Sequence, residues 1–180
     1  MKLKGINLKS LTYGQANELV QPLSDQELMQ LFDSSSIKLG DTAVDYPVKR
    51  RKHHMIINAV YSRTLRTRNG KVRAANVLEG HLFGGRCKNV PKTFGALMIL
   101  AGDRNRDAVN TALGSIVFLR DKSVLPKPRE FYAKTGLEDY RKAIQAIEEN
   151  DYRIYSPYDS PPEEWETNAL KYRGRENLFL

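Results

Sequence analysis

The stretch IINAVYSRTLRTRNGKVRAANV, residues 56–77, decides the fold that the sequence predicts. Its Asn69-Gly70 pair is the strongest short-range signal for a β-hairpin, because a type I′ turn needs positive φ at both central residues. Tyr61, Thr64 and Thr67 also favour strands. The alternative is a helix over residues 54–68 with Gly70 as its left-handed cap, since apolar residues at 55, 56, 59 and 60 have helical spacing.

The hairpin register places cations opposite one another on one polar face, and much of the other face suits a core. The opposed pairs are Arg68 with Lys71 and Arg66 with Arg73. Each like-charge pair destabilises a sheet by a few tenths of a kcal/mol up to about 1 kcal/mol. A polyanion would relieve this repulsion, because arginine matches phosphate oxygens with two donors. The same side chains could instead spread into water, or pair with the acidic remainder of the chain or a sister subunit.

The N-terminal part is predicted to be helical. Ser24 and Glu27 have the spacing of a capping box, and the apolar residues Leu28, Leu31 and Phe32 follow on one face. A shorter helix is expected near residues 15–20. Residues 40–47 are expected to form a loop, because a proline ends the segment.

Two elements are predicted in the middle of the chain. The continuous apolar run Phe94–Leu100 is typical of a strand buried on both faces. A helix follows, with apolar residues at 109, 112, 113, 116 and 117. Asp103 could be a catalytic or metal-binding carboxylate after a strand, but the favoured interpretation is that Asp103 or Asn105 caps this helix.

The last predicted helix begins with a second capping-box pattern, Thr135 and Glu138, after a proline-rich loop at 124–129. The sequence therefore predicts an α+β fold with N-terminal helices, a basic β-hairpin, a buried strand and two C-terminal helices. Residues 1–150 are expected to form a single domain. Residues 151–180, which are rich in Tyr, Pro and Glu, are expected to form an extended arm.

Positive charge is concentrated in residues 48–92. This segment holds twelve Lys and Arg residues and one acid, Glu79, an excess of eleven positive charges. The whole chain carries a net charge of +8, so the remainder is slightly acidic. A one-sided basic segment is typical of proteins that bind nucleic acid.

We therefore predict a non-enzymatic nucleic-acid-binding protein, such as an accessory factor or a component of a nucleoprotein particle, that contacts the phosphate backbone of DNA or RNA. Few aromatic residues occur among the cations, which favours backbone contacts over base recognition. The predicted interface consists of ten cations: Lys49, Arg50, Arg51, Lys52, Arg66, Arg68, Lys71, Arg73, Arg86 and Lys88.

Two other functions stay open. The chain could be a structural or interaction subunit of a larger, even virion-like, assembly, with the hairpin and the arm docking onto an acidic protein surface. It could also be a small metal-independent ribonuclease that uses His54 or His81, because imidazole titrates near neutrality. His53, His54, His81 and Cys87 match no zinc pattern, so no metal and no cofactor are predicted.

The compartment follows from features the sequence lacks. Cys87 is the only cysteine, so no disulfide can form within the chain, and no signal-peptide pattern follows the N-terminal lysines. The longest apolar run, Phe94–Ala101, is far too short to cross a membrane. The sequence thus predicts a cytoplasmic protein without a membrane partner.

Overall fold

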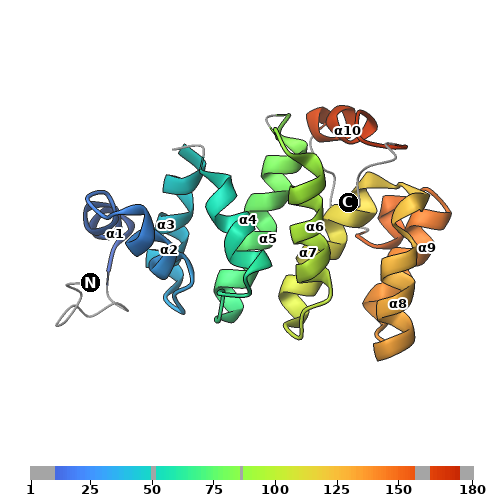
Figure 1. Cartoon of the computed structure of the whole chain (residues 1–180), viewed down its shortest axis with the longest axis horizontal. Coiled ribbons are helices and arrows are strands. Elements are labelled where there is room, and N and C mark those ends of the chain that lie inside the picture. The colour runs from blue at the N-terminus through green and yellow to red at the C-terminus, as the bar shows by residue number, and fades with distance from the viewer. Residues whose placement is uncertain (1–10, 50–51, 86, 157–162, 175–180) are drawn as a thin grey trace. The chain divides into compact units, whose positions relative to one another are not determined.

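The computed structural model describes residues 11–49, 52–85, 87–156 and 163–174, and all regular secondary structure within these ranges is helical (Figure 1). The predicted α+β class is therefore wrong, because no strand or sheet occurs in the described ranges. The α-helices are α1 (Tyr13–Val20), α2 (Asp25–Phe32), α3 (Ile37–Lys49), α4 (His53–Tyr61), α5 (Arg68–Phe83), α6 (Val90–Ala101), α7 (Arg106–Leu119), α8 (Pro126–Thr135), α9 (Glu138–Glu148) and α10 (Glu163–Leu170). Two 3₁₀ helices, η1 (Lys122–Val124) and η2 (Tyr152–Ile154), complete the list.

The chain divides into two compact units, residues 1–77 (unit 1) and residues 78–180 (unit 2). The division falls inside α5. In unit 1, α3 packs against both α1 and α2 around a core that includes Ala16, Leu28, Leu31 and Leu39. The expectation that residues 1–150 form a single domain stays a prediction.

Unit 2 is built on the pairing of α6 with α7 and of α8 with α9, with α7 also against α9. Its core contains a group of aromatic rings. Phe83 meets Phe118 edge to face with ring centroids 5.0 Å apart, and Trp165 of α10 lies 6.0 Å from Phe83. Edge-to-face ring pairs of this kind add stability beyond the burial of their surface.

Helices were predicted correctly where a cap and an apolar stripe coincide. Ser24 is the N-cap of α2, and it forms the predicted reciprocal capping box with Glu27. The Ser24 hydroxyl lowers the pKa of the Glu27 carboxyl by hydrogen bonding to it. The short helix predicted near 15–20 is α1, and the predicted stripe at 109–117 is the buried face of α7.

The β-hairpin predicted over residues 56–77 is wrong, because this stretch contains most of α4 and the first ten residues of α5. The alternative helix over 54–68 is right only as far as Tyr61, where α4 ends. The positive φ near this end belongs to Arg63 (54°), whereas Gly70 lies in the first turn of α5. The opposed cation pairs of the hairpin therefore do not exist.

The loop predicted over 40–47 is also wrong, since α3 continues to Lys49. Pro47 has no N–H to donate within the helix, but it lies close to the end, where few further hydrogen bonds depend on it. The buried strand predicted at 94–100 is instead α6. Its burial was correctly predicted, because Phe94, Leu97 and Leu100 are almost inaccessible. A helix that is covered on all sides shows the same unbroken apolar run as a buried strand.

Two smaller expectations concern helix starts. Asn105 caps α7 by accepting from the backbone of Asp107, and Asp103 accepts from the Asn105 N–H at 2.8 Å, so the favoured capping interpretation is confirmed. The box predicted at Thr135 is wrong, because α9 has no side-chain cap. Thr135 donates instead to the Phe131 carbonyl of α8.

The described part of 151–180 is not an extended arm. It contains η2 and α10, and Asn168 and Tyr172 are buried. Asn168 donates through Nδ2 to the Phe83 carbonyl at the end of α5, with a distance of 2.6 Å. This contact supplies a donor to one of the carbonyls that a helix leaves without a partner at its C-terminus.

Candidate nucleic-acid interface

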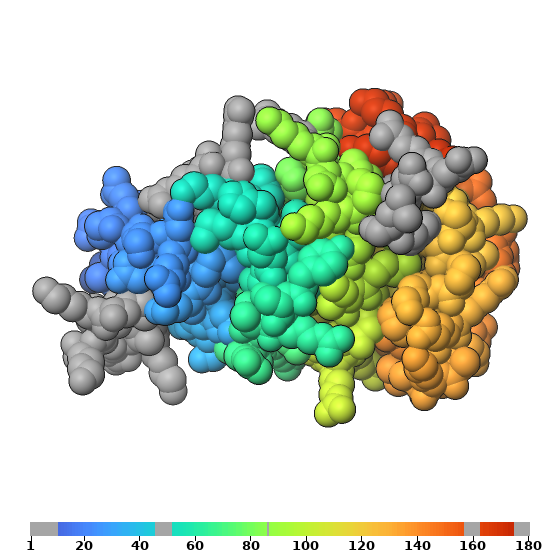
Figure 2. Space-filling view, in the orientation of Figure 1, coloured from blue at the N-terminus to red at the C-terminus, as the bar shows by residue number. Residues whose placement is uncertain are grey.

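Three exposed arginines of the basic segment lie in the connection between α4 and α5 and at the first residue of α5. We call residues 62–68 the arginine loop. Arg63, Arg66 and Arg68 are exposed, while Leu65 between them is buried. In the described ranges no ion pair involves Arg63 or Arg66. The surface of this region, coloured teal, lies on the face that Figure 2 shows.

Asp33, which follows α2, holds the backbone of the arginine loop. Its carboxylate accepts from the Arg66 N–H at 2.7 Å and from the N–H and hydroxyl of Thr67 at 3.0 and 3.1 Å. The Thr67 hydroxyl in turn accepts from the Gly70 N–H at 2.9 Å, as an N-cap does. The negative charge of Asp33 lies at the positive end of the α5 dipole, where it is stabilising.

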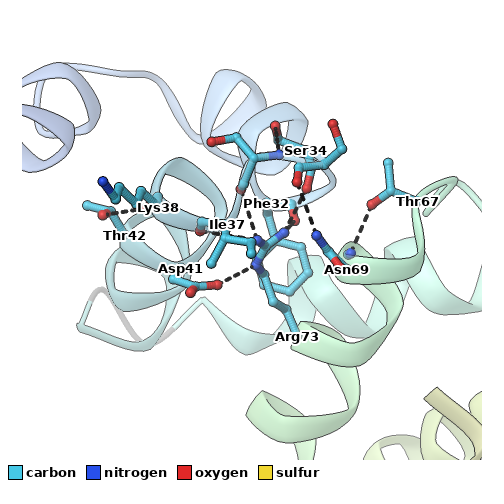
Figure 3. Close-up of polar contacts among 12 residues, drawn as sticks. Phe32, Ser34, Ile37, Lys38, Asp41, Thr42, Thr67, Asn69 and Arg73 are labelled. Atoms are coloured by element: carbon cyan, nitrogen blue, oxygen red, sulfur yellow. Dashed lines mark hydrogen bonds and ion pairs between the residues drawn. The ribbon is translucent and has the colours of Figure 1, made fainter. Parts of the chain in front are cut away.

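Gly70 is needed because Asp33 lies so close to it. A Cβ built on Gly70 would overlap the Asp33 carboxylate and lie 2.9 Å from the Asp33 Cα. Asn69 beside it donates from its amide to the Ser35 carbonyl at 3.1 Å. The Asn69-Gly70 pair therefore fixes the start of α5 against the α2–α3 turn (Figure 3).

Arg73 crosses from α5 to the same turn, and its side chain is buried (Figure 3). All five guanidinium N–H groups are used. Nε donates to Asp41 at 2.8 Å, and the two terminal nitrogens donate to four backbone carbonyls: Phe32 at 3.1 Å, Ser34 at 2.8 Å, Ser36 at 3.0 Å and Ile37 at 3.2 Å. Arg73 therefore supports the fold, and no donor is left for a phosphate.

Gly40 of α3 allows this arrangement. A Cβ built on Gly40 would overlap the guanidinium of Arg73, so the arginine passes directly over the bare backbone of the helix. The guanidinium also lies beside the last carbonyl of α2. A cation is stabilising at the C-terminal end of a helix.

The other predicted interface cations are distributed as follows. Arg50, Arg51 and Arg86 lie outside the described residues, and Lys49 is the last residue of α3. Lys52 forms an ion pair with Asp25. Lys71 is half-buried in the first turn of α5, and Lys88 is exposed in unit 2. The structure thus groups Arg66 and Arg68 and gives Arg73 a different role.

Arg63 is an interface candidate that the sequence-based set does not contain. In the predicted hairpin, side chains alternate between faces, which places Arg63 on the core-facing side opposite to that of Arg66 and Arg68. Its omission therefore followed from the wrong fold. In the structure it is exposed, and it adopts the left-handed conformation just beyond α4. The sequence did contain a signal for Arg63 as an interface residue, because Arg63 lies in a run of arginines without acidic residues.

The histidines and the cysteine show no metal-binding arrangement. Burial, and then the charge of His54, lower the pKa of His53 in the first turn of α4. The Cys87 sulfur lies 3.3 Å from the Thr93 hydroxyl, and burial raises its pKa. Within the described residues no three His, Cys, Asp or Glu side chains gather as metal ligands would.

Comparison with known proteins gives no relationship: no family model, curated protein or solved structure matches the chain. None of the helices in the described ranges combines the length and the apolar character needed to cross a membrane.

Proposed function

We propose that this chain is a non-enzymatic nucleic-acid-binding protein whose arginine loop contacts the phosphate backbone. The observation that carries the proposal is the exposure of Arg63, Arg66 and Arg68 within six residues on a loop that Asp33 holds in place. Three exposed arginines in a short stretch of chain raise the local positive potential. Phosphates are attracted to this potential, and their condensed counterions are released on binding.

Backbone anchoring favours binding in a second way. A loop that is already ordered loses less conformational entropy when its side chains meet a ligand. Lys49, Lys52, Lys71 and Lys88 stay in the proposed contact set, together with the undescribed Arg50, Arg51 and Arg86. Arg73 is excluded from the contact set, because all of its guanidinium N–H donors already form hydrogen bonds within the protein.

Replacing Arg63, Arg66 and Arg68 together by Gln is expected to weaken nucleic-acid binding and reduce its salt dependence. The slope of log K against log salt should fall by about 2 to 3, since each lost phosphate contact removes roughly 0.7 to 0.9. Fluorescence anisotropy with labelled single-stranded RNA, single-stranded DNA and duplex DNA between low and moderate salt measures this slope.

A matched control removes the same charge elsewhere. Arg129, Arg141 and Arg153 are exposed arginines that already pair with Glu148, Glu138 and Asp151. Their triple Gln variant should keep a slope close to that of the unchanged protein. If both variants lose affinity equally, the effect is one of net charge and the arginine loop is not the interface. If no probe binds at low salt, the proposal fails. EDTA is present in every sample. Any degradation of the RNA probe then reports cleavage that needs no metal.

A second proposal is an interaction subunit of a larger assembly, and exposed apolar side chains support it. Tyr13 and Ile37 in unit 1 and Leu170 in unit 2 are each more than half exposed. Burying such residues against a partner is favourable by roughly 1.5 to 3 kcal/mol for a full side chain. Light scattering of the purified chain should then give a discrete oligomer, and a strictly monomeric chain across concentrations would count against self-assembly.

A further inference from the structure

A half-open cleft of about 420 Å³ lies wholly within unit 2. Its walls come from Glu79 of α5, from one face of α7, from α9 and from the segment that follows α9. The volume falls in the range of small-ligand sites, roughly 300 to 1,000 Å³. No residue of the arginine loop lines it, so its role is separate from the proposed nucleic-acid contacts.

Carboxylates outnumber cations in the described lining of the cleft, although the chain as a whole is basic. The described lining contains two carboxylates, Glu79 and Asp139, and one cation, Lys142. Glu79 accepts from the Ser115 hydroxyl at 3.0 Å, and Asp139 accepts from Nε of the mostly exposed Arg106 at 3.0 Å. A carboxylate has about four lone-pair positions, so neither of these two hydrogen bonds alone fills its acceptor.

Two tyrosines, Tyr152 and Tyr155, form the aromatic part of the wall. The Tyr155 hydroxyl donates to the Asn110 carbonyl at 3.0 Å, which fixes the ring over Gly114. A Cβ built on Gly114 would lie 3.8 Å from this ring, an ordinary contact. Burial, and then the negative charge of Asp139, raise the pKa of Tyr155.

Asn110 contributes an acceptor that lacks a donor. Its Oδ1 is buried without a hydrogen-bond partner in the described structure, although the residue lines the cleft. A buried acceptor without a donor is unfavourable. A ligand N–H that enters beside the amide can supply that donor after a small rotation of the side chain.

We propose that this cleft binds a guanidinium or primary ammonium group carried on an alkyl chain. Carboxylates on two walls, an unsatisfied amide oxygen and tyrosine rings form a site that accepts hydrogen bonds and attracts cations. Two sources share this chemistry: a free alkylamine or guanidine, and an arginine side chain of a peptide.

Titration of the full chain with agmatine, followed by NMR shifts or calorimetry, tests the proposal. Agmatine should bind saturably, whereas uncharged pentanol and anionic glutarate should not. An acetylated, amidated Gly-Arg-Gly peptide distinguishes the sources, since tighter binding of the peptide indicates a peptide side chain and tighter binding of agmatine a free compound. Absence of saturable agmatine binding would overturn the proposal.

Two variants should change the affinity in opposite directions. Glu79→Gln keeps the hydrogen bond with Ser115 but removes a negative charge, so agmatine affinity should fall about tenfold. Lys142→Gln removes the competing cation, so affinity should rise severalfold. The exposed Lys122→Gln should change nothing. If Lys142→Gln weakens binding as Glu79→Gln does, the cleft does not select cations. Glu79→Gln should leave nucleic-acid affinity intact, so this proposal and that of the arginine loop fail independently.

Discussion

Replacement of Arg73 by Met is expected to lower the free energy of unfolding by about 3–5 kcal/mol, the cost of removing one partner from a buried ionic group. Met retains most of the apolar stem, so packing changes little and the loss comes mainly from the guanidinium. Four carbonyls of the α2–α3 turn and the Asp41 carboxylate lose their donor at once. Urea unfolding followed by circular dichroism measures the loss.

Two further variants make the result specific. Arg73→Lys keeps the charge but offers three donors in place of five, so a smaller loss of about 2 kcal/mol is expected. Arg153→Met removes an arginine that is 79% exposed and whose ion pair within the described residues is with its near neighbour Asp151, so a change within about 0.5 kcal/mol is expected. A loss below 1 kcal/mol for Arg73→Met would show that solvent replaces the guanidinium and that the network is not a major source of stability.

The role of Arg73 illustrates what the sequence could not reveal. Its carbonyl partners lie 36 to 41 residues earlier in the chain. In the sequence it is one cation among many, and nothing local distinguishes it from the exposed Arg66 and Arg68. The sequence-based interface therefore contained both the exposed arginines of the loop and an arginine that stabilises the fold.

The Asn69-Gly70 pair was misread for a related reason. A glycine in a sequence indicates either a positive φ or a close approach by another group. The hairpin interpretation chose the first explanation. The second is correct, because Gly70 is helical and makes room for Asp33, 37 positions earlier in the sequence. Only the tertiary contact with Asp33 distinguishes a close approach from a positive φ as the reason for the glycine.

The helix at residues 94–100, predicted as a buried strand, could in part have been recognised from the sequence. An apolar run of seven residues fits a strand or a buried helix equally well, and only its length and flanks decide. Asn89 caps α6, and Pro91 lies in its first turn, both familiar helix-start signals. Including them lengthens the element to twelve residues, a helix length. Where such signals were used, at Ser24 and at Asn105, the helices were predicted correctly.

Two glycines of α5 are expected to respond oppositely to the same substitution. Gly80→Ala should raise the free energy of unfolding by about 0.5–1 kcal/mol, because glycine is a poor helix former and no described atom lies within 4 Å of a Cβ there. Gly70→Ala should lower it by about 2 kcal/mol, within the range for overpacked sites. The added methyl group meets the Asp33 backbone, which cannot rotate away as a side chain can. Urea unfolding of both variants measures the difference.

The pair also tests whether an ordered arginine loop matters for binding. Gly70→Ala removes no charge, but it pushes away the carboxylate that holds the Arg66 and Thr67 N–H groups. If anchoring by Asp33 favours phosphate binding, nucleic-acid affinity should fall in Gly70→Ala, because the loop must first be ordered. The dependence of affinity on salt should stay the same, because the same phosphates are contacted. Gly80→Ala should bind as the unchanged chain does. Equal affinity in both variants, with Gly70→Ala destabilised, would mean that the exposed arginines alone matter and that Asp33 serves only the fold.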